Sequence, residues 1–377
     1  MLIKDIQTPA LILDADKMGN NIERMASRMA GYGVPLRPHL KTAKCAKVAD
    51  ALLSQNAKGI TVSTLGEAAY FLDHGIKDIT YAVCVTPNRF DQLDYLQCKG
   101  AHIKLIVDSL FAAKSLNSYA DFSSGMTFDV LIEIDSGEGR TGILADDPIL
   151  LDIAKVLHDG SRTNFAGVLT HGGHAYSCHS TLEIKDVARQ EREAVLLAAN
   201  HLKGAGLPCK IVSIGSTPTA THGDNFDGIT EIRAGVFVFG DLFQASIESH
   251  SLEDMAVSVL TTIISHRADR NQLIIDAGGL ALSKDRSTAN YGEDMGFGLV
   301  ASAGGDIISP HMTIKGVHQE HGEITSSKPI DFQRFPIGSQ LRIFPNHVCM
   351  TAAPYDKYHV ITQGDDISEI WDKKTGW

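Results

Sequence analysis

The sequence lacks an excess of positive charge, a long hydrophobic run and a paired-cysteine motif. Acidic residues outnumber basic ones by 45 to 34, which gives a formal net charge of −11. This sign argues against a nucleic acid or an anionic membrane as a partner. No apolar run approaches the roughly 18 residues that a membrane-spanning helix requires. We therefore expect small molecules and other protein chains as the partners.

Six cysteines are spread thinly over the 377 residues, and none forms a CxxC pair. In a chain of this size, such spacing is typical of reduced thiols rather than of a disulfide framework. The first residues, MLIKDIQTPALIL, also lack the basic segment, the apolar core and the small-residue cleavage site of a secretory signal. These features favour a cytoplasmic protein.

Eight short apolar runs recur through the first two-thirds of the chain, separated by segments with helical spacing. They are too apolar on both faces for half-exposed strands, so we interpret them as buried parallel strands. They occupy 34–41, 59–64, 78–85, 102–109, 128–135, 165–173, 210–217 and 231–240. Eight strand–helix units joined by right-handed crossovers close most economically as a (β/α)8 barrel of the TIM type. A doubly wound open sheet is the alternative.

After about residue 250 the pattern changes to strand runs separated by turn signals, without long helices. This pattern predicts a mostly antiparallel β domain. The expected fold class is therefore α/β, with a barrel at 9–250 followed by a C-terminal β domain at 251–377, which residues 1–8 are expected to join. A chain of this length exceeds one ordinary domain of about 100–200 residues, in keeping with two.

Polar residues are concentrated at the expected C-terminal ends of the barrel strands, where a barrel has its active site. Lys41 is notable because burial lowers the pKa of a lysine and favours the neutral amine that forms an imine with an aldehyde. The alternative is a strand-end lysine whose amine reaches solvent. Gly215, Ser216 and Thr217 offer hydroxyls and backbone amides where barrels commonly hold a phosphate, although they could also form a plain turn. One cofactor with an aldehyde and a phosphate is pyridoxal phosphate, PLP.

Several segments resemble those of a known family. PHLKTAKC (38–45) is similar to the cofactor-lysine segment of the fold-type III PLP enzymes, which include alanine racemase, D-threonine aldolase and D-serine dehydratase. The resemblance covers nearly the whole chain. Further similar segments are TPALILDAD (8–16), FDVLIEIDSGEGRTGI (128–143), THGGHAY (170–176) and EIRAGVFVFGD (231–241).

The resemblance implies a role for each matching residue. Lys41 would bind the cofactor, Arg140 would contact its phenolate oxygen, and His171 and Tyr176 would lie beside its ring. His39 flanks the lysine and would orient it or have only a structural role, and the same holds for Thr42. The implied cofactor-binding set is Lys41, His39, Arg140, His171, Tyr176, Gly215, Ser216, Thr217, Arg233 and Gly235.

Arg233 would face the pyridine nitrogen, a position at which relatives vary, and the amide of Gly235 would face the phosphate. A permanent cation disfavours protonation of that nitrogen, which weakens the ring as an electron sink. Substrate activation would then have to come partly from elsewhere.

A metal site is indicated by PNHVCMTAAPYD (345–356), where His347 and Cys349 would point to the same face of an expected strand. An isolated HxC is more often a buried cysteine beside a chance histidine. This stretch, however, resembles the metal-binding segment of the D-serine dehydratase and D-threonine aldolase branch. Thiolate and imidazole favour Zn²⁺, with Mn²⁺ or Mg²⁺ as alternatives. Aldolases typically carry aspartate where Cys349 stands, which favours dehydration here.

The resemblance therefore implies a lyase dependent on PLP and a divalent metal that acts on a β-hydroxy D-amino acid. The candidates are D-serine, D-threonine and 3-hydroxy-D-aspartate. Dehydration would give a 2-keto acid and ammonia, with Lys41 removing the Cα proton and the metal taking the hydroxyl. The main alternative is a D-threonine aldolase, in which His171 or a metal-bound hydroxide deprotonates the β-hydroxyl and the products are glycine and an aldehyde.

Two further alternatives are weaker. A racemase would need a second base, for which Tyr291 and Tyr355 are available, and a non-catalytic PLP carrier is usually a barrel alone. The family implies a homodimer with shared active sites. Asp285 could touch substrate across such a dimer, but a solvated loop is the favoured expectation for it. The preferred side chain at Cβ and the identity of the metal do not follow from the sequence.

Overall fold

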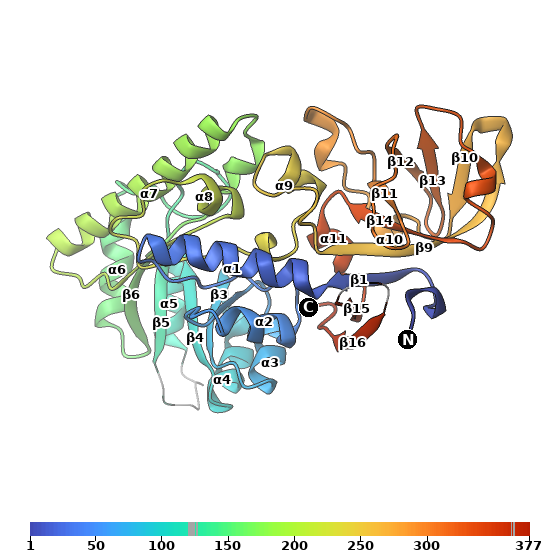
Figure 1. Cartoon of the computed structure of the whole chain (residues 1–377). Helices are drawn as coiled ribbons and strands as arrows, with labels where there is room; N and C mark the ends of the chain where they lie inside the picture. The colour runs from blue at the N-terminus through green and yellow to red at the C-terminus, as the bar shows by residue number, and fades with distance from the viewer. Residues whose placement is uncertain (120–124, 126, 363, 365) are drawn as a thin grey trace. The chain divides into compact units, whose positions relative to one another are not determined.

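A computed structural model describes the chain apart from residues 120–124, 126, 363 and 365. The described residues form two compact units (Figure 1). The β unit comprises Met1–Glu23, Thr42–Lys47 and Val236–Gly376, and the barrel unit comprises Arg24–Lys41, Val48–Gly235 and Trp377. None of the helices in the described part of the chain is both long and apolar enough to cross a membrane.

The barrel unit is built on seven strands, each parallel to the next one in the chain. They are β2 (Ile60–Val62), β3 (Asp78–Cys84), β4 (His102–Val107), β5 (Phe128–Glu133), β6 (Thr163–Leu169), β7 (Ile211–Ile214) and β8 (Glu231–Ile232). Nearly all their apolar side chains are buried, as expected for strands covered on both faces.

The segment 34–41 forms bridges rather than the continuous strand expected there. Leu36 bridges β8 and His39 bridges β2, both in parallel. Because Pro35 and Pro38 have no N–H to donate, regular pairing is interrupted along the segment. It nevertheless links the last strand to the first, so the seven strands and this segment form a ring. The predicted barrel is confirmed, and the open-sheet alternative is wrong.

Helices alternate with the barrel strands. They are α1 (Ala15–Gly31), α2 (Ala46–Leu53), α3 (Leu65–Asp73), α4 (Phe90–Cys98), α5 (Leu110–Ser118), α6 (Ile149–Asp159), α7 (Thr181–Gly204) and α8 (Thr217–His222). Several begin directly after a hydroxyl side chain that accepts a backbone N–H of the first turn, which favours a helix start. These N-caps are Thr64, Ser109, Ser180 and Ser216.

The β unit contains one nine-stranded sheet, in the order β10-β13-β12-β11-β14-β9-β1-β15-β16. Its strands are β1 (Ala10–Asp14), β9 (Val257–Arg267), β10 (Gln272–Ile275), β11 (Gly298–Ser302), β12 (Met312–Val317), β13 (Gly322–Ser326), β14 (Gln340–Pro345), β15 (Lys357–Ile361) and β16 (Ile367–Asp372). All neighbours are antiparallel except β1 and β15. Since β10 also pairs with β9, six of the strands form a closed barrel. The predicted antiparallel domain is confirmed.

The short helices of the β unit are α9 (Leu242–Ser246), α10 (Gly279–Leu282) and α11 (Val348–Ala352). Helix α11 replaces the strand that was expected to carry His347 and Cys349. Strand β14 ends at Pro345, and His347 is the N-cap residue of α11, so Cys349 lies in its first turn. That expectation of a strand is wrong, because Pro345 cannot donate to a further sheet partner.

Candidate active site

The barrel unit brings together five of the predicted site residues at its strand ends. The positive charges of Lys41, Arg233 and Arg140 act on the imidazole of His39, and the imidazole of His171 is a further neighbour that disfavours its protonation. Burial, and then these neighbours, hold the pKa of His39 well below its usual range, so that it is neutral at physiological pH. A site rich in cations has thus formed in a chain whose net charge is negative. Such a site suits an anionic ligand.

Lys41 follows directly after the bridged segment. Its backbone N–H donates to Nδ1 of His39 at 3.4 Å, and Nε2 of His39 lies 3.4 Å from the hydroxyl of Ser63. His39 therefore contributes to the shape of the turn that begins at Lys41. The lysine side chain is exposed in the described chain, so the expectation of a buried amine is wrong. The chain turns at residues 40–43 instead of continuing as a strand.

His171 is held in one orientation. Its Nδ1 lies 2.8 Å from the carbonyl oxygen of Gly215. A carbonyl only accepts, so Nδ1 carries the proton and Nε2 has the lone pair. Burial, together with the charges of Lys41 and Arg140, lowers the pKa of His171 to about 3 despite that hydrogen bond. The ring is therefore a neutral hydrogen-bond acceptor at Nε2, and the ring of Tyr176 lies 6.4 Å from it.

Arg233 is a buried cation directly after β8. Its guanidinium donates to the hydroxyl of Ser213 and to the carbonyl of Thr170. Burial lowers its pKa, and the charge of Glu231 opposes that shift. Glu231 also accepts from Ser213 at 2.8 Å and pairs with Arg37 at 2.7 Å. These contacts fix the guanidinium in place.

Arg140 lies on the loop after β5. Asp135 accepts the amides of Gly137 at 2.8 Å and Gly139 at 3.1 Å, which shapes the loop. The Arg140 side chain is 54% exposed and pairs with Glu138 at 3.3 Å. Its guanidinium is therefore accessible to a ligand.

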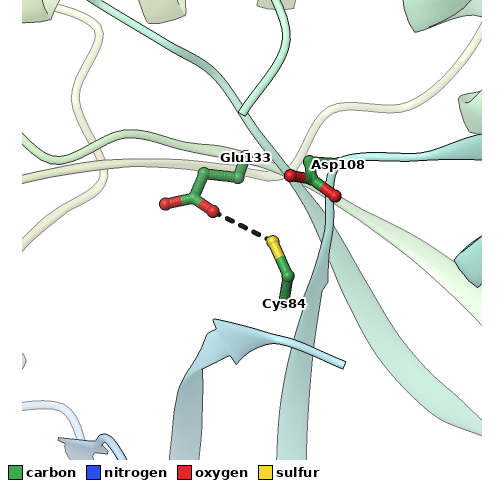
Figure 2. Close-up of side chains that lie close together, drawn as sticks. All are labelled: Cys84, Asp108 and Glu133. Atoms are coloured by element: carbon green, nitrogen blue, oxygen red, sulfur yellow. Dashed lines mark hydrogen bonds between the residues drawn. The ribbon is translucent and has the colours of Figure 1, made fainter. Parts of the chain in front are cut away.

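Three potential metal ligands meet where β3, β4 and β5 end. Cys84, Asp108 and Glu133 lie with their ligand atoms within 4.8 Å of one another, and the Cys84 thiol donates to Glu133 at 3.1 Å (Figure 2). Burial and the two carboxylates raise the pKa of Cys84 far above its usual range. The thiol is thus protonated in the metal-free chain. We did not predict this cluster, although each member lies at the end of a predicted strand.

The turn after β7 has fewer unpaired backbone amides for a phosphate than its sequence suggests. The amide of Gly215 donates to Glu191 at 2.8 Å, and that of Ser216 donates to Thr219 at 3.1 Å. The amides of Gly215 and Ser216 therefore already have acceptors within the chain. The amide of Gly235 makes no recorded hydrogen bond within the described residues. A Cβ at Gly235 would lie 2.6 Å from the carbonyl oxygen of His39, so only glycine fits there.

In the β unit, His347 and Cys349 are each held by a polar neighbour. Nδ1 of His347 lies 2.8 Å from Asp285, and Sγ of Cys349 lies 3.0 Å from the hydroxyl of Thr42. Asp241, which is fully buried, accepts the amide of Val348 at 3.0 Å and so supports the same turn. Asp285 lies in a loop, as expected, with its side chain 28% exposed, but its carboxylate is bound to His347.

Neighbouring groups set the protonation state of His347. Burial opposes a charge on His347, but the hydrogen bond to Asp285 and the neighbouring Cys349 raise the pKa of His347 to about 11. The same hydrogen bond lowers the pKa of Asp285 to about 2. At this pKa both ring nitrogens carry a proton. Because Nδ1 is bound to the carboxylate, an ion would bind at Nε2 and would have to displace the proton there. Carboxylate–histidine–metal arrangements of this kind orient the ring and increase its basicity. Imidazole and thiolate are donors that Zn²⁺ prefers.

Replacing Thr42 with valine is expected to weaken binding of the ion. The change removes the hydroxyl beside Cys349 but keeps the shape of the side chain. Loss of a partner that orients a ligand typically lowers metal affinity by about 10–100-fold. Thr42→Ser, which keeps the hydroxyl, is the control and should bind like the unaltered protein. Competition with a chromophoric chelator measures the affinity, and equal values for valine and serine would contradict this role.

A parallel barrel with a lysine in the turn after its first segment, followed by an antiparallel β domain, is an alanine-racemase-like fold. Residues 13–242 match the family model described as alanine racemase, N-terminal domain, and residues 256–361 match the putative serine dehydratase domain. The chain belongs to the fold-type III PLP family, in which PLP is the expected cofactor.

The relatives lie mainly in one branch of this family. The chain is 43% identical to D-threo-3-hydroxyaspartate dehydratase of Delftia sp. (strain HT23), over 99% of this chain and 98% of the relative. It is 32% identical to D-serine dehydratase of Dictyostelium discoideum (100% and 98% covered) and 29% identical to D-threonine aldolase of Arthrobacter sp. (97% and 92%). The solved Delftia structure superposes with a TM-score of 0.96 at 42% identity, covering both chains fully. The predicted enzyme class, a PLP-dependent lyase, is confirmed.

Proposed function

We propose that the chain dehydrates a β-hydroxy D-amino acid to a 2-keto acid and ammonia, with 3-hydroxy-D-aspartate as the preferred substrate. The observation that carries the reaction type is the donor pair of His347 and Cys349, because a thiol rather than a carboxylate stands beside the imidazole. The substrate is supported by the higher identity to the hydroxyaspartate dehydratase than to the D-serine dehydratase, 43% against 32%. D-Threonine aldolase activity is the alternative.

The barrel residues fit PLP. The cations around His39 suit its phosphate and phenolate, and the missing side chain at Gly235 leaves room beside an amide that has no hydrogen-bond partner in the described part of the chain. When bound, PLP would withdraw electrons from Cα and acidify its proton. We assign Lys41 as the residue that binds the cofactor and then removes this proton as a general base. Arg140, Tyr176, Ser216 and Thr217 complete the proposed cofactor site with the residues already described.

His171 and Arg233 have distinct proposed roles. His171 is neutral, and Nε2 can accept a proton or a hydrogen bond while Nδ1 stays bound to Gly215. Arg233 keeps a positive charge in place through its bonds to Ser213 and Thr170. A ring nitrogen in front of this guanidinium would stay unprotonated, because a second positive charge there is disfavoured.

His347 and Cys349 would hold the divalent ion, for which Zn²⁺ fits the donors best and Mn²⁺ or Mg²⁺ are alternatives. The ion would supply a Lewis acid for the departing β-hydroxyl. One solved structure of D-threo-3-hydroxyaspartate dehydratase is a cysteine-to-alanine variant in the metal-free form. It superposes on this chain with a TM-score of 0.96. This supports a cysteine ligand in the present chain.

The product assay tests the proposed reaction. Purified protein is incubated with 3-hydroxy-D-aspartate, D-serine and D-threonine, and keto acid, ammonia, glycine and aldehyde are measured separately. We expect keto acid and ammonia in equal amounts, fastest with 3-hydroxy-D-aspartate. Glycine with aldehyde would instead establish the aldolase. If no substrate were turned over by protein loaded with PLP and metal, the proposal would be wrong.

We also propose a cytoplasmic homodimer. None of the six cysteines, all of which lie in the described part of the chain, forms a disulfide, in keeping with a reducing compartment. The dimer rests on the family resemblance, and sedimentation analysis of the purified protein tests it.

A further inference from the structure

Glu191 lies in the middle of α7 and is completely buried, with 0% of its surface exposed. Its Oε1 accepts two backbone amides, from Gly172 at 2.7 Å and from Gly215 at 2.8 Å. The other oxygen, Oε2, is also buried and has no hydrogen-bond partner among the described residues. One side chain of a helix therefore binds the loops that follow two different barrel strands.

A carboxylate is an expensive residue at such a place. Burial raises the pKa of Glu191, and the amides of Gly215 and Gly172, the side chain of Thr219 and the charge of Arg233 oppose this shift. The other buried positions on this face of α7 are apolar: Ile184, Val187, Ala188, Val195, Ala198, Ala199 and Leu202. An apolar residue would pack there without a desolvation cost, but the two amides would then lose their acceptor.

The two amides belong to a closed set of contacts around His171. Gly172 is the next residue after His171, and the carbonyl of Gly215 accepts the Nδ1–H of the same imidazole at 2.8 Å. Glu191 thus holds the backbone on both sides of the ring. The fit is close, because a Cβ at Gly172 would lie 2.9 Å from the Glu191 carboxyl carbon.

We propose that Glu191 is a positioning residue, which fixes the orientation of His171 and the path of the turn from Gly215 to Thr217. By holding these two loops, Glu191 keeps the cofactor site in its binding conformation before the cofactor arrives. This inference rests on the proposed function, in which His171 lies beside the ring of PLP and the turn borders its phosphate.

Three variants of the full-length protein test the inference. Glu191→Leu removes the acceptor, Glu191→Gln keeps an oxygen at Oε1, and Glu193→Gln alters an exposed glutamate two residues further on the same helix. Hydrogen exchange of the amides in 170–173 and 213–217 is measured without PLP by mass spectrometry. The dissociation constant of PLP is measured for each variant by the change in its absorbance.

For Glu191→Leu we expect exchange about tenfold faster or more in both segments, and PLP binding about tenfold weaker or more, as for a lost buried hydrogen bond. For Glu191→Gln and for Glu193→Gln, we expect the exchange rates and the affinity for PLP to stay close to those of the unaltered protein. If exchange in Glu191→Leu rose equally throughout the barrel while PLP affinity was kept, Glu191 would be merely structural. Unchanged exchange in both segments would overturn the inference. If the unaltered protein bound no PLP, the proposed function would fail, while the exchange data would still test the positioning.

Discussion

Replacing Lys41 with alanine is expected to abolish formation of the keto acid. In the proposed function this lysine both binds the cofactor and removes the Cα proton. Loss of a general base alone costs about 10²–10⁴-fold in rate, and we expect at least the upper end of that range because both roles are lost. The visible absorbance of covalently bound cofactor should disappear as well.

The design of this experiment uses a neighbouring lysine. Lys47 lies on α2, exposed, six residues beyond Lys41. Lys47→Ala removes the same charge and should keep both turnover and absorbance. Persistence of turnover in Lys41→Ala at more than a hundredth of the normal rate would exclude Lys41 as the essential amine.

The backbone framework was largely predictable because hydrophobic periodicity depends on neighbouring residues. The runs at 102–109 and 128–135 became β4 and β5 within two residues at each end. The segment at 34–41 was less regular than expected, because Pro35 and Pro38 reduce its pairing capacity. The strand expected around His347 was wrong for a related reason, since Pro345 ends β14 and a helical turn follows.

The supporting residues of the site were harder to predict, because their partners lie far away in the sequence. Asp285 meets His347 across 62 positions, and Thr42 meets Cys349 across 307. No local pattern encodes such pairs. Glu191 lies in a segment with ordinary helical spacing, where a glutamate is usually exposed, so its burial was not predicted. The only signal for it in the sequence would have been its place among the apolar residues of one helix face.

Replacing His347 with alanine is expected to reproduce the effect of removing the metal. Asp285 holds the imidazole through Nδ1, so Nε2 would be the atom that binds the ion, and Cys349 alone would bind an ion weakly. A metal acting as Lewis acid contributes several kcal/mol to the stabilisation of a leaving oxygen. A loss of about 3–4 kcal/mol corresponds to a rate roughly 10²–10³-fold lower. Turnover and metal content are measured with and without EDTA.

The matched control is His321→Ala, which removes an exposed histidine from the hairpin between β12 and β13. It should keep both metal and turnover, whereas His347→Ala should keep only the reduced rate, and EDTA should not lower that rate further. If His347→Ala kept its full turnover and one ion per chain, the assignment of the metal site would be wrong. If His347→Ala lost its activity but still held an ion, we would infer that Cys84, Asp108 and Glu133 bind that ion. The further substitution Cys84→Ala should then release it. The measured metal content, and not only the activity, thus distinguishes the site at His347 and Cys349 from the cluster at Cys84, Asp108 and Glu133.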